Sequence, residues 1–295
     1  MRIVVAGSHG FIGSALLPRL RAGGHEVRAL VRRPPRSRDE ISWDPDAGTL
    51  DPAALDGVDA VVDLAGVNPG GRLLTAARKR AVVASRVRTA GLLARTIAAR
   101  QDQKPVLLQA SGIGAYGDRG DTPLDEQEPL GTTFFAEVVR QWEAAVRPAE
   151  AAGARVVLLR TGVVLGRGGG ALAPLLPVVR AGLGGRLGTG RQFWPWITLV
   201  DEVRAIEHLL TADVHGPVNL VTRADRNADV MAALAHAFGR PAAVPVPAAL
   251  LRLALRDFAT EVLGSVRAVP AALERSGFVP EHPDLETAAR WVAHG

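Results

Sequence analysis

Three glycines near the N-terminus have the spacing of a turn that binds phosphate groups. Gly7, Gly10 and Gly13 separate an apolar strand-like run, residues 2–6, from a helical pattern over 12–22. Such a turn offers a positive φ angle, close backbone approach to a pyrophosphate, and free N–H groups at the positive end of the helix dipole. A plain tight turn is the alternative, but the position between strand and helix favours a dinucleotide site. We expect its cofactor-binding residues to be Gly7, Ser8, His9, Gly10, Phe11, Ile12 and Gly13.

The end of the second predicted strand indicates which dinucleotide binds. An acidic residue there would bind the adenosine ribose hydroxyls and favour NAD, whereas a nearby arginine accommodates the 2′-phosphate of NADP. This strand, residues 26–31, is followed by Arg32 and Arg33, and the next acidic residue is Asp39. A guanidinium gives charged, forked donors to a phosphate. We therefore expect NADP rather than NAD, with Arg32 as the main contact. The alternative is two arginines that face solvent in an arginine-rich chain.

The next two predicted strands end in residues that suit a cofactor and its substrate. The third strand ends in Leu64, Ala65 and Gly66, where small residues would let the backbone lie against the cofactor. The fourth strand is followed by Ser111, whose hydroxyl could orient a substrate carbonyl or hydroxyl beside the nicotinamide. A serine that only caps the turn is the alternative.

An aromatic cluster follows a glycine-rich stretch, residues 182–190, and is the candidate substrate wall. It consists of Phe193, Trp194 and Trp196, with Arg191 beside it. Aromatic rings and an arginine would suit an apolar or ring-bearing substrate that carries an anionic group. The alternative is that these rings only fill the core.

The order of the predicted elements indicates how these residues are positioned. Apolar strands at 2–6, 26–31, 59–65, 105–110 and 155–160 alternate with helices at 12–22, 75–100 and 134–152. This pattern predicts an α/β fold with a Rossmann-type doubly wound parallel sheet, whose ligands bind at the carboxyl ends of the strands. Residues 1–165 are expected to form this domain, with 197–222 returning to it. Residues 166–196 and 223–295 are expected to form a smaller, mainly α C-terminal lobe on the substrate side.

Several of these motifs together resemble a known family. The glycine turn, Leu64-Ala65-Gly66, Ser111 and residues 160–166 look like an extended-type short-chain dehydrogenase/reductase. Residues 188–197, with the tail segments 245–247 and 273–278, resemble its atypical branch, usually labelled NAD-dependent epimerase or nucleoside-diphosphate-sugar epimerase family proteins. Members of that branch carry a C-terminal helical region. Further cofactor contacts are expected at Arg86, Ala110, Thr161, Gly162 and Val163.

The resemblance implies an NADP(H)-dependent oxidoreductase that acts on a small organic substrate. A sugar-nucleotide epimerase and a non-catalytic dinucleotide-binding sensor are the alternatives. Typical members of the superfamily use a Tyr-x-x-x-Lys pair, and the corresponding positions here hold Phe135 and Val139. Neither side chain ionises, so the usual general acid is missing. Tyr116, the chain's single tyrosine, lies on a glycine-flanked loop and is the expected proton donor, with Ser111 positioning the substrate.

Composition limits the other classes of function. The chain has 295 residues, 47% of them hydrophobic, no cysteine and a net charge of +5. The absence of cysteine excludes disulfides and thiolate metal sites and fits a cytoplasmic protein. We expect no metal, no membrane segment, and a monomer or homodimer. The basic run Arg78-Lys79-Arg80 could suggest a nucleic-acid face, but no stacking aromatics accompany it, and a solvated helix face is favoured.

Overall fold

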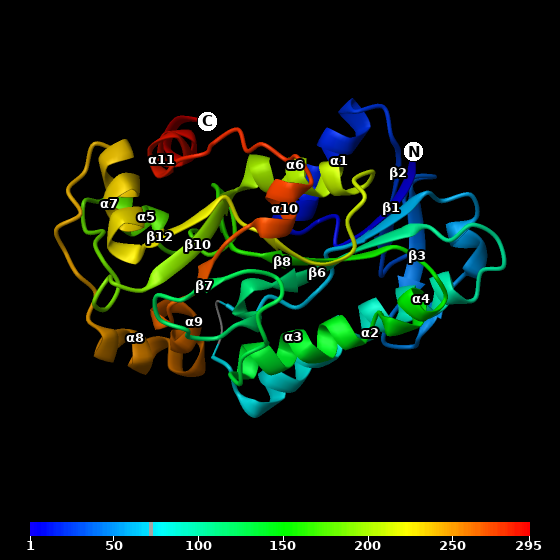
Figure 1. The fold of residues 1–295 in the computed structure, drawn as a ribbon, viewed down its shortest axis with the longest axis horizontal. Coiled ribbons are helices and arrows are strands. Elements are labelled where there is room, and N and C mark those ends of the chain that lie inside the picture. The colour runs from blue at the N-terminus through cyan, green and yellow to red at the C-terminus, as the bar shows by residue number, and fades with distance from the viewer. Residues whose placement is uncertain (71–72) are drawn as a thin grey trace.

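The computed structural model describes residues 1–70 and 73–295, and an eight-stranded sheet runs through its larger part (Figure 1). The strands follow the spatial order β11-β8-β6-β5-β1-β2-β3-β4. All neighbours pair in parallel except β3 and β4. The bounds are β1 Arg2–Ala6, β2 Glu26–Val31, β3 Glu40–Asp44, β4 Thr49–Leu50, β5 Ala60–Asp63, β6 Val106–Gly112, β8 Val156–Thr161 and β11 Gly216–Leu220.

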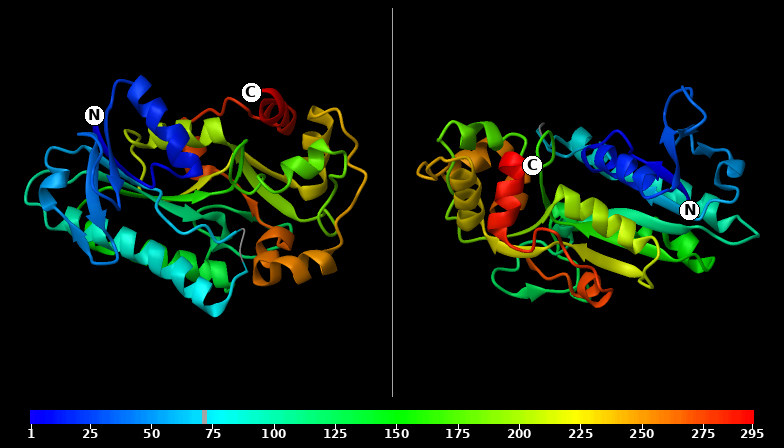
Figure 2. Two further views of the ribbon diagram at one scale, coloured as in Figure 1. Left: turned by 180° about the vertical axis from the view of Figure 1, so that it is seen from behind. Right: turned by 90° about the horizontal axis from the view of Figure 1, so that it is seen from above.

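Helices cover both faces of this sheet (Figures 1 and 2). Along β1, Ile3 and Val5 point to one buried layer and Val4 and Ala6 to the other, because side chains alternate along a strand. The continuous apolar sequence of β1 is therefore explained by burial on both sides. One layer contains α1 (Phe11–Ala22), α6 (Leu199–Leu209) and α10 (Ala271–Arg275), and the other contains α2 (Ala76–Ala98), α3 (Phe134–Ala144) and α4 (Arg147–Ala151).

The parallel sheet confirms the fold class that the sequence predicts. The helix expected over 134–152 is divided into α3 and α4, because Pro148 has no N–H with which to continue the helix. The sheet also extends past β2 through β3 and β4, which the sequence reading missed. In β3 the buried Ile41 and Trp43 alternate with more exposed polar residues, the pattern of a strand near a sheet edge.

The second half of the chain builds a lobe beside the sheet. Its three-stranded sheet has the order β12-β10-β9, with β9 at Val163–Leu165, β10 at Phe193–Thr198 and β12 at Arg223–Arg226. A separate apolar cluster joins this sheet to α5 (Leu176–Arg180), α7 (Asn227–Ala237) and α11 (Leu285–His294). Within 197–222, α6 packs against α1 and β11 joins the main sheet. The boundaries between the two parts stay a prediction.

The C-terminal segment returns to the carboxyl edge of the main sheet. It runs through α8 (Ala248–Leu255) and α9 (Ala259–Leu263). Its strand β13 (Arg267–Ala268) then pairs with β7 (Pro123–Leu124), in the loop that follows β6. Hydrogen bonds of Ser265 with Arg119 and Gly120 fasten the same contact. This contact places residues near 260 over the end of β6.

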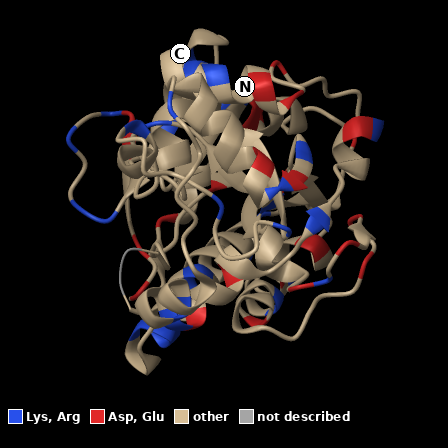
Figure 3. Cartoon of the chain, turned by 90° about the vertical axis from the view of Figure 1, so that its left-hand side faces the viewer, with Lys and Arg blue, Asp and Glu red and all other residues tan. Residues whose placement is uncertain are grey.

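Charged residues of both signs are interspersed on the face shown in Figure 3. Within the predicted basic run, the ammonium of Lys79 lies 2.5 Å from a carboxylate oxygen of Asp257. Farther along α2, Arg88 lies 2.6 Å from Asp46. These ion pairs neutralise part of the positive charge of α2 within the molecule. In the described residues no helix is both long and apolar enough to cross a membrane.

Candidate functional site

The glycine turn between β1 and α1 has the geometry that a pyrophosphate needs. Gly7 has a φ of +78°, and a Cβ placed there would lie 2.6 Å from the backbone carbon of Leu64. A Cβ on Gly13 would overlap the carbonyl oxygen of Gly7. At Gly10 the nearest atom to an added Cβ is the Gly7 oxygen, at 3.2 Å. Gly7 and Gly13 are thus required by the fold, whereas the space over Gly10 is open to a ligand.

The first turn of α1 leaves its backbone donors to that open space. Gly10 is the N-cap residue and provides no side-chain cap, and the first turn contains no acidic residue. The N–H groups of Phe11, Ile12 and Gly13 have no hydrogen-bond partner in the described parts of the chain. Such free donors at a helix N-terminus suit an anion. Ser8 is buried beside them, and His9 is exposed, with its Nδ1 3.0 Å from the Ser8 Oγ.

Arg32 and Arg33 differ in availability, although they are neighbours at the end of β2. Arg33 makes two hydrogen bonds of 2.7 Å to the carboxylate of Glu40, and this pairing lowers the pKa of Glu40 to about 2. Arg32 is exposed and takes part in no ion pair with the described residues. Of these two residues, Arg32 is the one whose guanidinium is available to a phosphate.

The loop after β5 lies against the glycine turn, as the contact of Leu64 with the Gly7 position shows. Ala65 is buried and Gly66 is exposed. Arg86 supports this loop from α2 and donates hydrogen bonds to the carbonyls of Val67 and Val82. Burial lowers the pKa of Arg86 to about 10. The guanidinium of Arg86 thus holds the loop, which differs from the direct cofactor contact expected for it.

Ser111 lies at the end of β6 in a buried polar network. Its Oγ donates a hydrogen bond of 2.7 Å to Glu143 of α3. The carboxylate of Glu143 accepts two bonds of 2.9 Å from Arg160 of β8, so the pair is bidentate. Only about a tenth or less of either charged side chain is exposed. The hydroxyl proton of Ser111 is therefore committed to Glu143.

Tyr116 occupies the interior rather than a cavity wall, which corrects the expected proton donor. Its side chain is fully buried. Its hydroxyl lies 2.9 Å from the carbonyl of Asp125, 2.8 Å from Oδ1 of Asn219 and 3.1 Å from Arg160. Burial raises the pKa of the phenol. Because the ring fills the core and the hydroxyl has protein partners, Tyr116 cannot reach a substrate in this conformation.

A cavity of about 530 Å³ lies beyond the end of β6 and at the starts of β9 and β10. Gly114 and Val163 line it from the main-sheet side, and α8, α9 and the following loop line it from the C-terminal side. Val163 is one of the residues expected to bind the cofactor. The hydroxyl of Thr161 donates a hydrogen bond of 2.8 Å to the carboxylate of Glu202. A Cβ on Gly162 would lie 2.7 Å from the carbonyl oxygen of Pro195. Those two residues therefore serve packing inside the protein, and only Val163 of this trio reaches the cavity.

The predicted substrate wall is divided by the fold. Phe193 and Trp194 line the cavity, and their role as a substrate wall stays a prediction. Trp196 is fully buried, and its indole N–H donates a hydrogen bond of 2.8 Å to Asp225. The assignment of Trp196 to the cavity wall is therefore wrong. Arg191 lines a different hollow, together with Asp121 and Arg226. Trp194 and Trp196 lie on the same face of β10 and in the same apolar cluster, because alternate residues of a strand share a face. Trp194 lines the cavity at the start of the strand, whereas Trp196 lies two residues farther along, inside the lobe.

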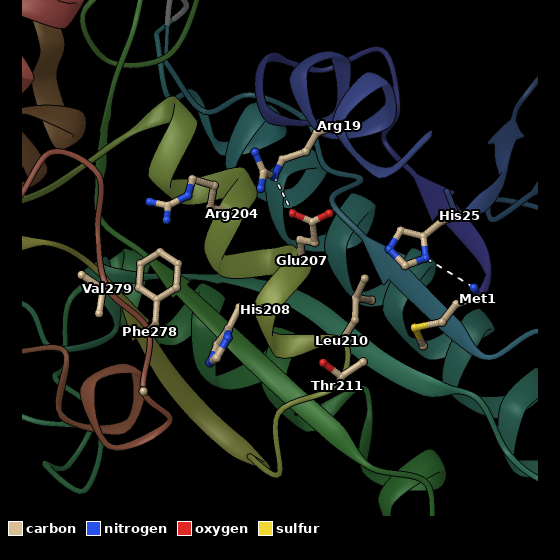
Figure 4. Close-up of a pocket in the computed structure, with 11 residues that line it drawn as sticks. Met1, Arg19, His25, Arg204, Glu207, His208, Leu210, Thr211, Phe278 and Val279 are labelled. Atoms are coloured by element: carbon tan, nitrogen blue, oxygen red, sulfur yellow. Dashed lines mark hydrogen bonds and ion pairs between the residues drawn. The ribbon is translucent and has the colours of Figure 1, made fainter. Parts of the chain in front are cut away.

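A second cavity, of about 550 Å³, lies between α1 and α6 (Figure 4). Met1 and His25 line it, and these residues precede β1 and β2, so it lies at the amino edge of the sheet. In its wall, Nε of Arg19 lies 2.6 Å from a carboxylate oxygen of Glu207. None of the predicted site residues lines it. Because ligands of doubly wound sheets bind at the carboxyl edge, the cavity over β6 is the candidate site.

Four polar residues at or near this site were missed by sequence reasoning: Glu143, Arg160, Asn219 and Glu261. Arg160 does leave a signal, because one arginine ends the otherwise apolar run of β8. Glu143 lies two helical turns after Phe135 and one after Val139 on α3, so it shares their face. Asn219 and Glu261 leave no such signal. They reach the site only because β11 and the C-terminal segment return to the sheet.

Comparison with known proteins decides the family. Residues 3–221 match the NAD dependent epimerase/dehydratase family. The chain belongs to this family. Residues 246–292 match a domain of unknown function, DUF1731, which covers the C-terminal segment that lines the cavity. An epimerase family protein of Mycobacterium tuberculosis is 44% identical over 283 residues, covering 95% of this chain and 93% of the relative.

Solved structures of relatives share the whole architecture. Human epimerase family protein SDR39U1, crystallised with NADPH, has a TM-score of 0.90 and 34% identity, with 99% of each chain covered. A nucleoside-diphosphate sugar epimerase from Corynebacterium glutamicum has a TM-score of 0.80 and 33% identity, covering 99% of this chain and 58% of its own. The expected atypical epimerase-family assignment is therefore confirmed.

Proposed function

We propose that this chain is an NADP(H)-dependent oxidoreductase of the atypical short-chain family and acts on a small organic substrate. The carrying observation is that the 530 Å³ cavity shares Val163 with the expected cofactor contacts and opens at the carboxyl edge of the sheet. NADPH in the crystals of the human relative supports the choice of cofactor. When bound, the cofactor would supply a hydride to the substrate.

The residues at the glycine turn have separate roles in this proposal. The free N–H groups of Phe11, Ile12 and Gly13 hold the pyrophosphate over Gly10. The exposed guanidinium of Arg32 binds the 2′-phosphate, which makes NADPH bind more tightly than NADH. Leu64, Ala65, Gly66 and Ala110 provide backbone surface along the cofactor. Arg86 positions that surface through its bond to Val67.

Substrate binding is assigned to the walls of the cavity. Phe193 and Trp194 provide an apolar surface, and Arg252 and Arg256 line the C-terminal side. Neither arginine forms an ion pair with the described residues, so each is available to an anionic group of the substrate. This role replaces the one expected of Arg191. Ser111 remains a positioning residue, because its oxygen can accept a hydrogen bond while its proton is held by Glu143.

The alternatives predict different fates of the cofactor. Phe135 and Val139 are both buried and cannot ionise, which favours a non-catalytic sensor if no other group transfers a proton. A sugar-nucleotide epimerase would return its hydride and leave no net change in cofactor.

The test measures NADPH binding and turnover together. Calorimetry with NADPH and NADH gives the affinities, and NADPH absorbance is followed with a panel of ketones, aldehydes and quinones. An oxidoreductase consumes NADPH with at least one of them. Binding without consumption in the whole panel indicates the sensor, and interconversion of a nucleotide sugar without net oxidation indicates the epimerase.

A further inference from the structure

The C-terminal segment brings the carboxyl group of Glu261 on α9 to the candidate cavity at the end of β6. A Cβ placed on Gly114 would lie 2.6 Å from Oε2 of Glu261 and 3.3 Å from Cβ of Phe135. Gly114 comes three residues after Ser111. The carboxyl therefore meets the β6 loop beside Phe135, the residue at the position where typical relatives carry their tyrosine.

The surroundings leave this carboxyl available for proton exchange. Glu261 makes no hydrogen bond or ion pair with the described parts of the chain. Burial raises its pKa to about 7. The other charged groups that line the cavity are Asp118, Arg252, Arg256 and Asp257. Asp257 is paired with Lys79, so its charge is largely compensated. Phe135, Phe193 and Trp194 contribute no titratable group.

We propose that Glu261 is the general acid of this site and protonates the oxygen of a carbonyl substrate held against the β6 loop. The inference rests on the proposed function. The substrate's carbonyl carbon takes the hydride of a reduced nicotinamide dinucleotide, and its oxygen takes the proton of Glu261. The C=O double bond becomes a single bond, the cofactor is oxidised by two electrons, and the resulting carboxylate recovers a proton from solvent. In the reverse direction the carboxylate accepts the proton of an alcohol.

A pH profile of the intact protein tests this role, with phenanthrenequinone as the carbonyl probe and NADPH as the reductant. For the wild type, kcat/KM should be highest below about pH 7 and fall above it, because the protonated acid is needed. Glu261→Gln should lower the plateau by about 10²-fold or more and remove that fall. Glu286→Gln, on the exposed face of α11, is the matched control and should behave as wild type.

A second readout is independent of turnover. NMR titration with isotope-labelled glutamate should show a carboxyl that titrates near pH 7, below that of Glu202 near pH 8, and Glu261→Gln should remove the signal near pH 7. An unchanged rate and profile in Glu261→Gln, or a rise in KM alone with the pH dependence retained, would overturn the role of Glu261 while leaving the proposed function intact. A wild type that binds NADPH but reduces neither the probe nor any carbonyl of the panel refutes the proposed function and this inference together.

Discussion

The glycine turn and the candidate cavity lie at the same edge of the sheet but are built in different ways. The turn comes from one continuous segment, residues 7–13, and the hydrogen-bond donors that it offers are backbone N–H groups. The cavity combines side chains of four distant parts of the chain: the β6 loop, Val163, the start of β10 and residues 252–266. The backbone of a short segment can prepare a general anion site, whereas a specific substrate site needs side chains that only the complete fold brings together.

The two regions also differ in their electrostatics. At the turn no acidic side chain lies in the first turn of α1, so the helix end keeps its positive potential for an anion. At the cavity, burial raises the pKa of the Glu261 carboxyl to about 7. The turn thus keeps a positive potential, whereas the cavity contains a carboxyl group whose charge changes near neutral pH.

The largest effect is expected at the turn. Gly10→Val should abolish NADPH binding, because the branched side chain occupies the space over Gly10 where the phosphates must lie. The fold should survive, since an added Cβ would meet only the Gly7 oxygen at 3.2 Å. Calorimetry gives the affinity and thermal unfolding gives the stability. Tight NADPH binding by a folded Gly10→Val protein would remove the turn from the cofactor site.

The next effect concerns the buried network that joins the adjacent strands β6 and β8 to α3. Arg160→Met should lower the free energy of unfolding by about 3–5 kcal/mol, because it leaves the buried carboxylate of Glu143 without its partner. The control is Arg140→Met, which breaks the exposed pair with Glu137 on the same helix and should change stability little. Urea unfolding measures both. Similar losses for the two variants would mean that burial does not distinguish these ion pairs.

A smaller effect separates the two dinucleotides. Arg32→Ala should lose about 10- to 100-fold in NADPH affinity and little in NADH affinity, because one charge-assisted contact to the 2′-phosphate is removed. Arg38→Ala removes the same charge from a nearby exposed side chain and serves as the control. Affinities for both cofactors come from calorimetry. Equal losses for NADPH and NADH would contradict the assignment of Arg32.

The last effect is a pH dependence of stability that comes from Glu202, the hydrogen-bond partner of Thr161. Burial raises the pKa of Glu202 from 4.5 to about 8 in the folded protein. The folded state therefore keeps a proton that the unfolded chain releases, and this stabilisation is complete below about pH 4.5 and is lost as pH rises to about 8. The change is at most about 1.4 kcal/mol per pH unit.

Glu202→Gln isolates that contribution. The amide oxygen can still accept the hydrogen bond from Thr161, so the variant should retain its fold and lose part of the pH dependence. Asp63 and Glu261 titrate in the same range and contribute equally to both proteins. Urea unfolding between about pH 5 and pH 8 provides the comparison. Parallel stability curves for wild type and variant would show that Glu202 is not buried in its neutral form.

The cofactor side of the site could largely be predicted from local patterns, although the individual residue roles there remain proposals. Glycine spacing and the alternation of strand and helix depend on residues that are close together in the sequence, so both could be predicted from it. The substrate side was predicted less well. Phe193 and Trp194 do line the cavity, but Trp196 and Tyr116 are core residues. A ring of the same chemistry can serve a wall or a core, and its sequence neighbours do not distinguish the two.

By itself, the sequence determined the doubly wound sheet, the place of the dinucleotide turn and the family of the protein. The first two follow from the period of the apolar residues and from backbone conformations that only glycine adopts readily, both of which are local properties. The family follows from the resemblance of several motifs to those of known members. The tertiary structure alone decided which arginine of the Arg32-Arg33 pair is available, that Tyr116 faces Asn219, and that Glu261 reaches the end of β6. Each of these depends on segments tens to more than a hundred residues apart or on a competing side chain, and the folded packing decides which contacts form.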